Sequence, residues 1–145
     1  MSDTTIRRAR PADAAEMARL CGELGYPLSA EEMQRRLGVL LPNDRHLVVV
    51  AAERDSLYGW AHGEHRFSLE GGDRAELMGL VVDARSRRGG VGRALVAGIE
   101  AWVAARGIRS LTVRSNAARA ESHPFYAALG YERSKTQHVY TKAFP

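Results

Sequence analysis

The stretch that decides the fold is Leu77-Met78-Gly79-Leu80-Val81-Val82, followed after four residues by Arg87-Arg88-Gly89-Gly90-Val91-Gly92-Arg93. The first run is typical of a strand, and the second is a basic glycine turn that opens a helical segment ending at Arg106. Such a turn presents backbone N–H groups at a helix N-terminus, where the partial positive charge attracts anions and glycine permits close approach. With Arg85, four arginines fall within nine residues. The sequence therefore predicts a site for a ligand with a pyrophosphate and a further phosphate.

The length and composition of the chain are typical of a soluble protein with one core. We expect a single domain over residues 1–145. Hydrophobic residues make up 45% and charged residues 26%, which are ordinary values for a globular protein. No apolar run approaches the ~20 residues that span a bilayer, and the opening residues lack the apolar core of a signal peptide. We therefore expect a cytoplasmic protein without a membrane partner.

The single cysteine and the charge pattern argue against two further classes of function. Cys21 cannot form an internal disulfide, and no Cys/His cluster has zinc spacing, so no metal is expected. Because Cys21 lies among Met17, Leu20 and Leu24, we expect it in the core. The net charge of +4 is not gathered in one basic stripe with aromatic residues, so no nucleic-acid partner is expected.

The spacing of apolar residues predicts strands and helices that alternate in one α/β domain. Ser29 and Glu32 form a capping-box pattern that starts a helix, and the short link Arg54–Ser56 predicts an antiparallel hairpin. The expected order is βααβββαβαβ, a mixed sheet of about six or seven strands flanked by about four helices. The expected strands are 4–8, 46–53, 58–69, 75–83, 110–115 and one or two within 132–144, and the expected helices are 11–24, 30–40, 90–106 and 122–129.

The glycine turn and a second motif about 33 residues later carry a family resemblance. Arg87, Gly90 and Gly92 match the pattern R/Q-x-x-G-x-G/A between a strand and a helix. Asn116 follows the next expected strand, and Phe125–Tyr131 matches F-Y-x-x-x-G-Y/F at the end of the last helix. With these motifs the chain resembles the GCN5-related N-acetyltransferases (GNAT), whose elements follow the same order.

The remaining parts of the chain fit this resemblance with one departure. Ile6–Asp13 matches the opening pattern I-R-x-A-x-x-x-D of the family, and the turn is no Walker loop because no Gly-Lys-Ser/Thr follows. The departure is Pro124, which a helix tolerates only in its first turn. We therefore expect the last helix to start near Ser122 or His123.

The resemblance implies an enzyme that transfers the acetyl group of acetyl-CoA to a primary amine by direct attack in a ternary complex. It implies that the turn holds the pyrophosphate and that the preceding strand pairs through its backbone with the pantetheine arm. A backbone N–H near Leu80 is expected to hydrogen-bond the thioester carbonyl, an oxyanion-hole role. The cofactor-binding residues that the resemblance implies are Leu80, Val81, Val82, Arg87, Arg88, Gly89, Gly90, Val91, Gly92, Arg93, Asn116 and Tyr126.

Tyr126 and Glu76 are the residues that the resemblance suggests for proton transfer. Tyr126 would protonate the departing thiolate or donate a hydrogen bond to it, since pKa values of about 10 for tyrosine and about 8.5 for a thiol make full transfer uphill by ~2 kcal/mol. Glu76 is the expected base for the amine because, by strict alternation, it shares a strand face with Leu80. The alternatives for the base are His62, Glu64, His65, His123 and a water molecule.

The acceptor pocket is expected between Gly25–Leu28 and Arg66–Asp73, the regions that form it in the family. Acidic residues there and nearby favour a cationic amine; they are Glu64, Glu70, Asp73 and Glu76. The compact size and the tail Lys135–Tyr140 are similar to those of small GNAT members grouped with aminoglycoside 6′-acetyltransferases, so we expect a small-molecule amine, such as an aminoglycoside. The alternatives are a lysine or N-terminal amine of a protein, and a module that binds acetyl-CoA without catalysis. The resemblance also suggests a homodimer.

Overall fold

A computed structural model describes residues 4–86, 89–114 and 122–145. The chain divides into two compact units, Met1–Arg114 and Ser115–Pro145. The strands of the first unit are β1 (Thr5–Arg8), β2 (His46–Glu53), β3 (Ser56–Ser68), β4 (Gly72–Val82) and β5 (Leu111–Val113). Its helices are α1 (Ala14–Glu23), α2 (Ala30–Leu40) and α3 (Val91–Ala105), with 3-10 turns η1 (Pro11–Asp13) and η2 (Ala84–Ser86). The second unit contains α4 (Ser122–Ala128).

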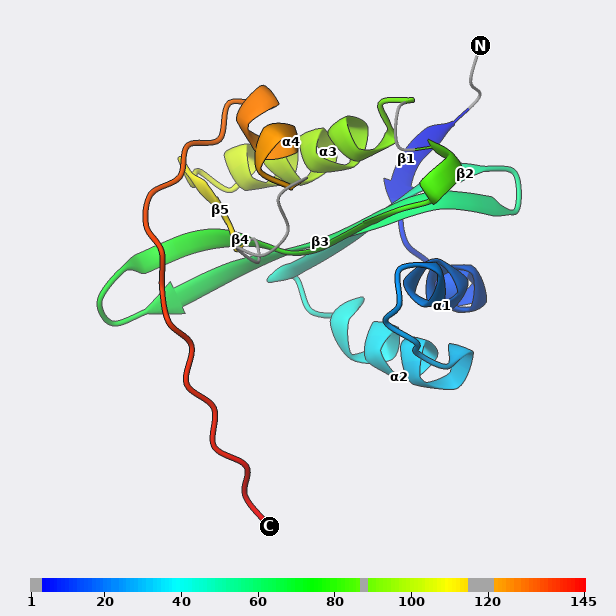
Figure 1. Ribbon diagram of the computed structural model, residues 1–145, viewed down its shortest axis with the longest axis horizontal. Coiled ribbons are helices and arrows are strands. Elements are labelled where there is room, and N and C mark those ends of the chain that lie inside the picture. Colours follow the sequence, from blue (N-terminus) through cyan, green and yellow to red (C-terminus); the bar gives the residue numbers. More distant parts are fainter. Residues whose placement is uncertain (1–3, 87–88, 115–121) are drawn as a thin grey trace. The chain divides into compact units, whose positions relative to one another are not determined.

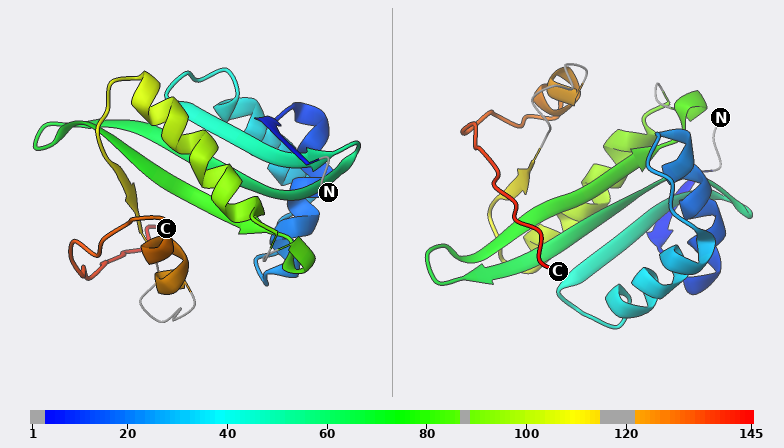
Figure 2. Two further views of the ribbon diagram at one scale, coloured as in Figure 1. Left: turned by 90° about the horizontal axis from the view of Figure 1, so that it is seen from above. Right: turned by 60° about the horizontal axis from the view of Figure 1, so that its bottom comes forward.

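The strands of the first unit form one mixed sheet in the order β1-β2-β3-β4-β5. Neighbouring strands are antiparallel from β1 to β4, whereas β5 is parallel to β4. The crossover helix α3 lies on one face of the sheet, and α1 and α2 lie on the other (Figure 1, Figure 2). This arrangement confirms the α/β fold class and the predicted hairpin of β2 and β3.

Apolar side chains are buried on both faces of the sheet. On the α1/α2 face, Met17 and Leu20 belong to a cluster with Val50, and each is at most 2% exposed. On the other face, a Cβ at Gly63 would lie 2.8 Å from Cγ2 of Ile99, which is closer than real Cβ atoms come. Glycine on β3 therefore lets α3 approach the middle of the sheet.

Two local sequence motifs, at Ser29 and at Asp13, form hydrogen bonds where helical segments begin. Oγ of Ser29 accepts the backbone N–H of Glu32 at 3.0 Å, which confirms the predicted helix cap. The Asp13 carboxylate accepts both terminal nitrogens of Arg7 at 2.8 and 2.9 Å and the N–H of Arg10 at 2.8 Å. Burial raises the pKa of the Asp13 carboxyl, but these bonds outweigh burial and leave the pKa below its usual value. The opening motif thus ties β1 to η1.

The second unit differs from the prediction at its end. Helix α4 begins at Ser122, as Pro124 indicated. Residues 131–145 form no strand, so within the described residues the sheet has five strands and the predicted count of six or seven was wrong. Val139 and Tyr140 favour extended backbone but are 87% and 92% exposed. A strand also needs a partner backbone, which a residue pattern does not supply.

Candidate active site

The second half of β4 has an edge that β5 does not cover. Among the described residues, β5 pairs only with residues 75–77, so residues 79–82 are paired on the β3 side alone. The backbone N–H of Asp83 donates to the carbonyl of Tyr58 on β3 at 2.7 Å. Because N–H groups alternate in direction along a strand, the N–H of Leu80 points away from β3, toward this edge. The edge therefore offers backbone donors and acceptors to a ligand.

A β-bulge at Met78 interrupts the pairing of β4 with β3. In the register, Gly79 pairs with His62 and Leu77 pairs with Gly63, so Met78 is an extra residue on β4. The bulge lies where the pairing with β5 ends. It shifts the alternation of side chains by one position for the rest of β4.

The bulge places Glu76 and Leu80 on opposite faces of the sheet, so the prediction of a shared face was wrong. Glu76 pairs with Glu64, and Leu80 pairs with Ala61. Glu64 and Ala61 are three positions apart on β3, an odd offset, and therefore point to opposite faces. Strict alternation failed because it assumes one residue of β4 for each residue of β3.

The glycine turn reaches the N-terminus of α3 with backbone that only glycine adopts easily. Gly90 is the N-cap with φ of 80°. A Cβ built on Gly90 would have no heavy atom of the described residues within 4 Å, so these residues leave the space beside it open. Since Gly90 has no side chain that could cap α3, the N–H groups of residues 91–93 face this space with the positive end of the helix dipole. This geometry fits the predicted pyrophosphate of acetyl-CoA.

The structure describes only part of the predicted phosphate site. Gly89 and Arg93 are exposed, while Val91 and Gly92 are buried in the first turn of α3. Val81 and Val82 on β4 are half-buried. The predicted residues outside the described part are Arg87, Arg88 and Asn116.

Asp83 anchors the end of β4 just before the turn. Asp83 is 1% exposed, and its carboxylate accepts the backbone N–H of Arg85 at 2.8 Å and the guanidinium of Arg85 at 3.2 and 3.3 Å. The bond from the Arg85 side chain is the largest cause that holds the pKa of the Asp83 carboxyl below its usual value. Because Arg85 is paired with Asp83, it offers less positive charge to a phosphate than the sequence suggested.

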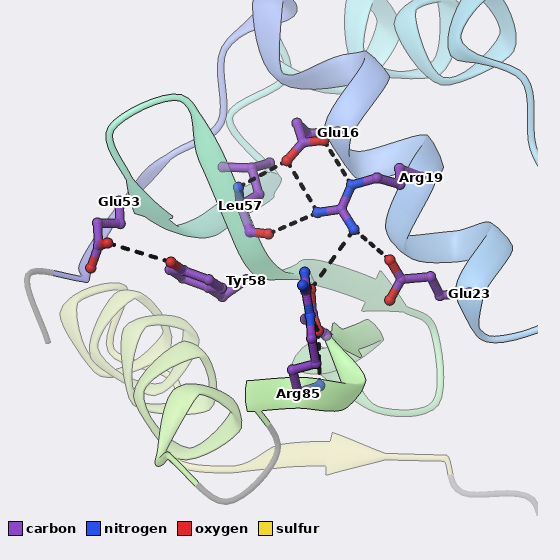
Figure 3. Close-up of polar contacts among 8 residues, drawn as sticks. Glu16, Arg19, Glu23, Glu53, Leu57, Tyr58 and Arg85 are labelled. Atoms are coloured by element: carbon purple, nitrogen blue, oxygen red, sulfur yellow. Dashed lines mark hydrogen bonds and ion pairs between the residues drawn. The ribbon is translucent and has the colours of Figure 1, made fainter.

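Arg19 on α1 contacts β3 and the residue that follows β4, as Figure 3 shows. Its guanidinium donates to Glu16 at 2.7 Å, to the carbonyl of Leu57 at 3.2 Å and to Glu23, and it lies 3.8 Å from Asp83. Glu16 in turn accepts the backbone N–H of Leu57 at 3.1 Å. These bonds lower the pKa of Glu16, with the bond from Arg19 as the largest cause. The network links α1 to β3 and to the residue that follows β4.

A cavity of about 850 Å³ lies on the α1/α2 face, over β2 and β3. The predicted segment Gly25–Leu28 lines it, whereas Arg66–Asp73 does not. Its lining is mostly apolar and includes Cys21, which is 8% exposed as the core prediction requires; burial raises the pKa of its thiol. The polar side chains among the described lining residues are those of Tyr26, Trp60, Arg35, Arg36 and His62, and no carboxylate occurs among them.

Two of the four acidic residues expected to attract a cationic amine, Glu64 and Glu76, are paired with arginines instead. Oε1 of Glu76 accepts from Arg66 at 3.3 Å and from Arg114 at 3.0 Å, and Glu76 is 8% exposed. Glu64 lies 3.5 Å from Arg66. Glu76 points to the face of the sheet that holds the cavity, but it is not among the residues that line the cavity. Two guanidinium groups thus donate to the same oxygen of this carboxylate.

His65 lies on the opposite face of β3 and is not brought to the cavity. Its Nε2 is 2.7 Å from Oδ1 of Asp73, and its Nδ1 accepts Nε–H of Arg106 at 2.9 Å. Both ring nitrogens thus contribute to packing between the sheet and the end of α3.

His62 lines the cavity and contacts a histidine that the sequence analysis missed. Nε2 of His62 lies 2.8 Å from Nδ1 of His46. Burial, and to a lesser degree the charge of His46, lowers the pKa of His62 to about 4. The signal that could have found His46 is the hairpin register, which pairs it with Glu64, two residues from His62.

Tyr126 lies in α4 of the second unit, where its ring packs against two aromatic neighbours. The ring centroids of Phe125 and Tyr131 are 5.1 and 6.0 Å from that of Tyr126, both in edge-on geometry. Burial raises the pKa of the Tyr126 hydroxyl. The side chain of His123, an alternative base, lies outside the described residues. Across residues 4–86, 89–114 and 122–145, no cluster of three or more His, Cys, Asp or Glu could hold a metal ion, and no helix is long and apolar enough to cross a membrane.

Comparisons with known proteins agree with this geometry. Residues 13–131 match the model of the acetyltransferase (GNAT) family. The chain is 31% identical over 139 residues to the aminoglycoside N(6')-acetyltransferase type 1 of Stenotrophomonas maltophilia, covering 92% of this chain and 90% of that protein.

Two solved structures share the fold. The aminoglycoside N-acetyltransferase AAC(6')-Iy in complex with CoA has a TM-score of 0.87 at 20% identity, covering 98% of this chain and 96% of the other. Glucosamine-6-phosphate N-acetyltransferase from Arabidopsis thaliana has a TM-score of 0.79 at 19% identity, covering 99% and 100%. The family expected from the glycine turn and the F-Y-x-x-x-G-Y motif is confirmed: the chain belongs to the GNAT family and is an acetyl-CoA-dependent acetyltransferase.

Proposed function

We propose that the chain acetylates a primary amine of a small molecule, which binds in the cavity while acetyl-CoA binds along the β4 edge. The observation that carries this proposal is the strand register. Trp60 and His62 line the cavity and pair with Val81 and Gly79, the two neighbours of Leu80. The amine and the outward N–H of Leu80 thus belong to adjacent positions on paired strands. Direct attack in a ternary complex requires this closeness.

The donor side of the site is proposed to bind acetyl-CoA mainly through backbone groups. The pyrophosphate accepts hydrogen bonds from the N–H groups at the start of α3. Arg87, Arg88 and Arg93 supply positive charge. The pantetheine arm extends along residues 80–82 and is bonded by Asn116. The N–H of Leu80 stabilises the oxyanion that forms as the amine attacks the thioester carbonyl.

Tyr126 is proposed to stabilise the leaving sulfur. Because burial raises the pKa of its hydroxyl, Tyr126 is a weaker acid than free tyrosine, and complete proton transfer to a thiolate is further uphill. A hydrogen bond from the hydroxyl to the sulfur does not require this transfer. We therefore assign Tyr126 a hydrogen-bonding role that is strongest as the C–S bond breaks.

Two observations bear on the class of amine, the curated relative and the lining of the cavity. The curated relative is an aminoglycoside N(6')-acetyltransferase, which supports an amine carried by an aminosugar. The described cavity lining is mostly apolar, and its cations Arg35 and Arg36 are both bonded to Glu32. This lining supports an amine with an apolar body. A substrate panel should therefore contain both kinds.

We propose further that the two units form one GNAT domain, since the family model spans both of them. A cytoplasmic location agrees with the use of acetyl-CoA. A homodimer is supported by large apolar side chains exposed in the tail, those of Val139, Tyr140 and Phe144. Sedimentation of the full chain with and without residues 132–145 tests the dimer.

The test of the proposed function follows free CoA thiol while purified protein and acetyl-CoA react with an amine panel. The panel contains aminoglycosides, glucosamine, monoamines with apolar bodies, and lysine and N-terminal peptides. Thiol release with a small amine, with the acetylated product seen by mass spectrometry, supports the proposal. Turnover of peptides alone favours a protein acceptor, and tight acetyl-CoA binding without any release favours a binding module.

A further inference from the structure

Three polar side chains on the α1/α2 face form a continuous chain that ends in the cavity. Oε2 of Glu64 lies 3.6 Å from Nε2 of His46, and Nδ1 of His46 lies 2.8 Å from Nε2 of His62. The two rings are inclined by 33° with centroids 5.1 Å apart. The side chains of His46 and Glu64 are only 15% and 24% exposed. His62 is the member that lines the cavity.

The contacts of the two rings favour one placement of their hydrogens. A carboxylate accepts but does not donate, so Glu64 favours the tautomer of His46 with hydrogen on Nε2. Nδ1 of His46 is then an acceptor, and the 2.8 Å contact requires His62 to donate from its Nε2. The Nδ1 of His62 is thereby left with a lone pair. A neutral imidazole in this state can accept one proton.

We infer that His62 takes the proton from the amine, and that His46 and Glu64 are positioning residues that set its tautomer and stabilise its charged form. This inference rests on the proposed function, because it needs an amine in the cavity. The strand register supports it, since His62 pairs with Gly79, the residue before Leu80. The same logic of a nucleophile's base oriented by a second group operates in other acyl transferases.

The protons of the reaction balance as follows. The ammonium loses one proton to Nδ1 of His62, and the resulting free amine attacks the thioester carbon to form a C–N bond. As the tetrahedral intermediate collapses, the C–S bond breaks, the nitrogen loses a second proton and the sulfur gains one. One net proton leaves through the histidine pair to solvent.

The surroundings of His62 oppose a positive charge on its ring. Burial, and to a lesser degree the charge of His46, lowers the pKa of His62 to about 4. The negative charge of Glu64 favours a proton on the pair. The other charged or titratable groups of the described residues that face the pair or the same cavity are Cys21 on α1, Tyr26 after α1, Arg35 and Arg36 on α2, and Arg66 on β3.

The first experiment replaces the base with His62→Gln and measures kcat for the best amine of the panel from pH 3.5 to 9, a range that includes the lowered pKa of His62. We expect kcat to fall about 100-fold and the loss of activity at acid pH to disappear, because the imidazole that acts as the base is gone. Acetyl-CoA affinity and thermal stability report that the fold is retained. The matched comparison is His65→Gln, which removes a histidine from the other face of the same strand. Wild-type kcat and pH profile in His62→Gln would overturn the inference.

The second experiment separates positioning from packing. Glu64→Gln should lower kcat about tenfold. It should also move the fall of kcat at acid pH, the acid limb of the profile, to lower pH, since loss of the negative charge weakens proton binding by the pair. Glu64→Asp, which keeps the charge, should restore most of kcat and bring the acid limb back to its wild-type pH. His46→Gln should lower kcat by a similar factor. A fall in kcat with an unmoved limb in Glu64→Gln would mean that Glu64 acts only by packing.

A readout without turnover keeps the inference distinct from the proposed function. Ring ¹⁵N shifts of labelled protein should show both His46 and His62 with hydrogen on Nε2 at neutral pH, and one proton bound by the pair on acidification. Hydrogen on Nδ1 of His62 would contradict the inference whether or not any amine is acetylated. If the wild-type protein releases no thiol with any amine, the proposed function fails instead.

Discussion

Glu76 and Leu80 point to opposite faces of β4, although their spacing in a regular strand would put them on one face. The extra residue at Met78 is the cause. It lets the first half of β4 contribute Glu76 to a polar cluster on the α1/α2 face while the second half presents its backbone to the uncovered edge. One strand can thus serve the stability of the sheet and the binding of the donor.

Glu76→Gln should reduce stability more than it reduces catalysis. Loss of the charge weakens the bonds from Arg66 and Arg114, and bonds to a charged group are worth about 1.5–3 kcal/mol. We expect a lower midpoint in urea and a fall in kcat much smaller than in His62→Gln. A larger fall in kcat than in His62→Gln would support Glu76 as the base.

Gly79→Ala should raise the KM for the amine. A Cβ at Gly79 would lie 3.0 Å from Cζ3 of Trp60, so the indole that lines the cavity must move by a few tenths of an ångström. The matched control is Gly63→Ala, whose Cβ meets Ile99 on the α3 face at 2.8 Å. Overpacking there should reduce stability by about 1–3 kcal/mol without raising the amine KM. Equal KM changes in both variants would argue against Trp60 as part of the acceptor site.

Gly90→Ala should weaken acetyl-CoA binding at least tenfold. The alanine at this position has to adopt φ near 80°, at a strain of about 1–2 kcal/mol. Its Cβ enters the space beside the helix N-terminus that the described residues leave open. Gly107→Ala creates the same strain at the other end of α3, since Gly107 has φ of 77° and its Cβ would also meet nothing within 4 Å. Calorimetry should therefore show similar losses of stability, with lost affinity in Gly90→Ala alone.

Tyr126→Phe should lower kcat about tenfold or more while the Kd for acetyl-CoA stays within about twofold, because the lost hydrogen bond forms only as the sulfur departs. Stopped-flow detection of thiol and equilibrium binding separate the two quantities. Tyr131→Phe, which also removes a hydroxyl in the second unit, is the comparison. If the two variants have the same kcat, the catalytic role of Tyr126 is rejected.

Acid should destabilise the chain through its paired carboxylates. The pKa values of Asp13, Glu16 and Asp83 are lowered in the folded state. Their contribution is therefore complete above the unfolded pKa of about 4 and is lost as pH falls toward the folded values. Asp83→Asn should lower stability at pH 7 by about 1–3 kcal/mol and flatten its decline below pH 4. Urea unfolding at pH 3, 5 and 7 measures this, with Glu32→Gln as an exposed comparison expected to change less.

Local patterns predicted most elements because the information for them is local. The run His46–Glu53 became β2 with the predicted bounds, and the apolar stripe of Val91, Leu95 and Ile99 became the buried side of α3. The bulge at Met78 and the absence of a strand in residues 131–145 depend on partner backbone. No pattern within a single segment encodes that partner.

The residues of the candidate site also fall into those that a local motif predicts and those that depend on contacts with other segments. The glycine turn could be predicted because its motif is contiguous and its chemistry resides in the backbone. His46 could not, since its role depends on the register that brings it within 2.8 Å of His62. The pairing of Arg85 with Asp83 was missed for a different reason: charge counting treats each arginine as available until a partner is known.

The uncovered edge of β4 has a consequence for the life of the protein. Among the described residues, Leu80–Val82 is an apolar stretch whose backbone is paired on one side alone, and such stretches can pair with other chains and aggregate. If acetyl-CoA binds along this edge as proposed, it takes the place of a neighbouring strand, and at 100 times its Kd a ligand stabilises the folded state by about 2.7 kcal/mol. Loss of acetyl-CoA would then favour pairing of this edge with other chains, in addition to stopping the reaction.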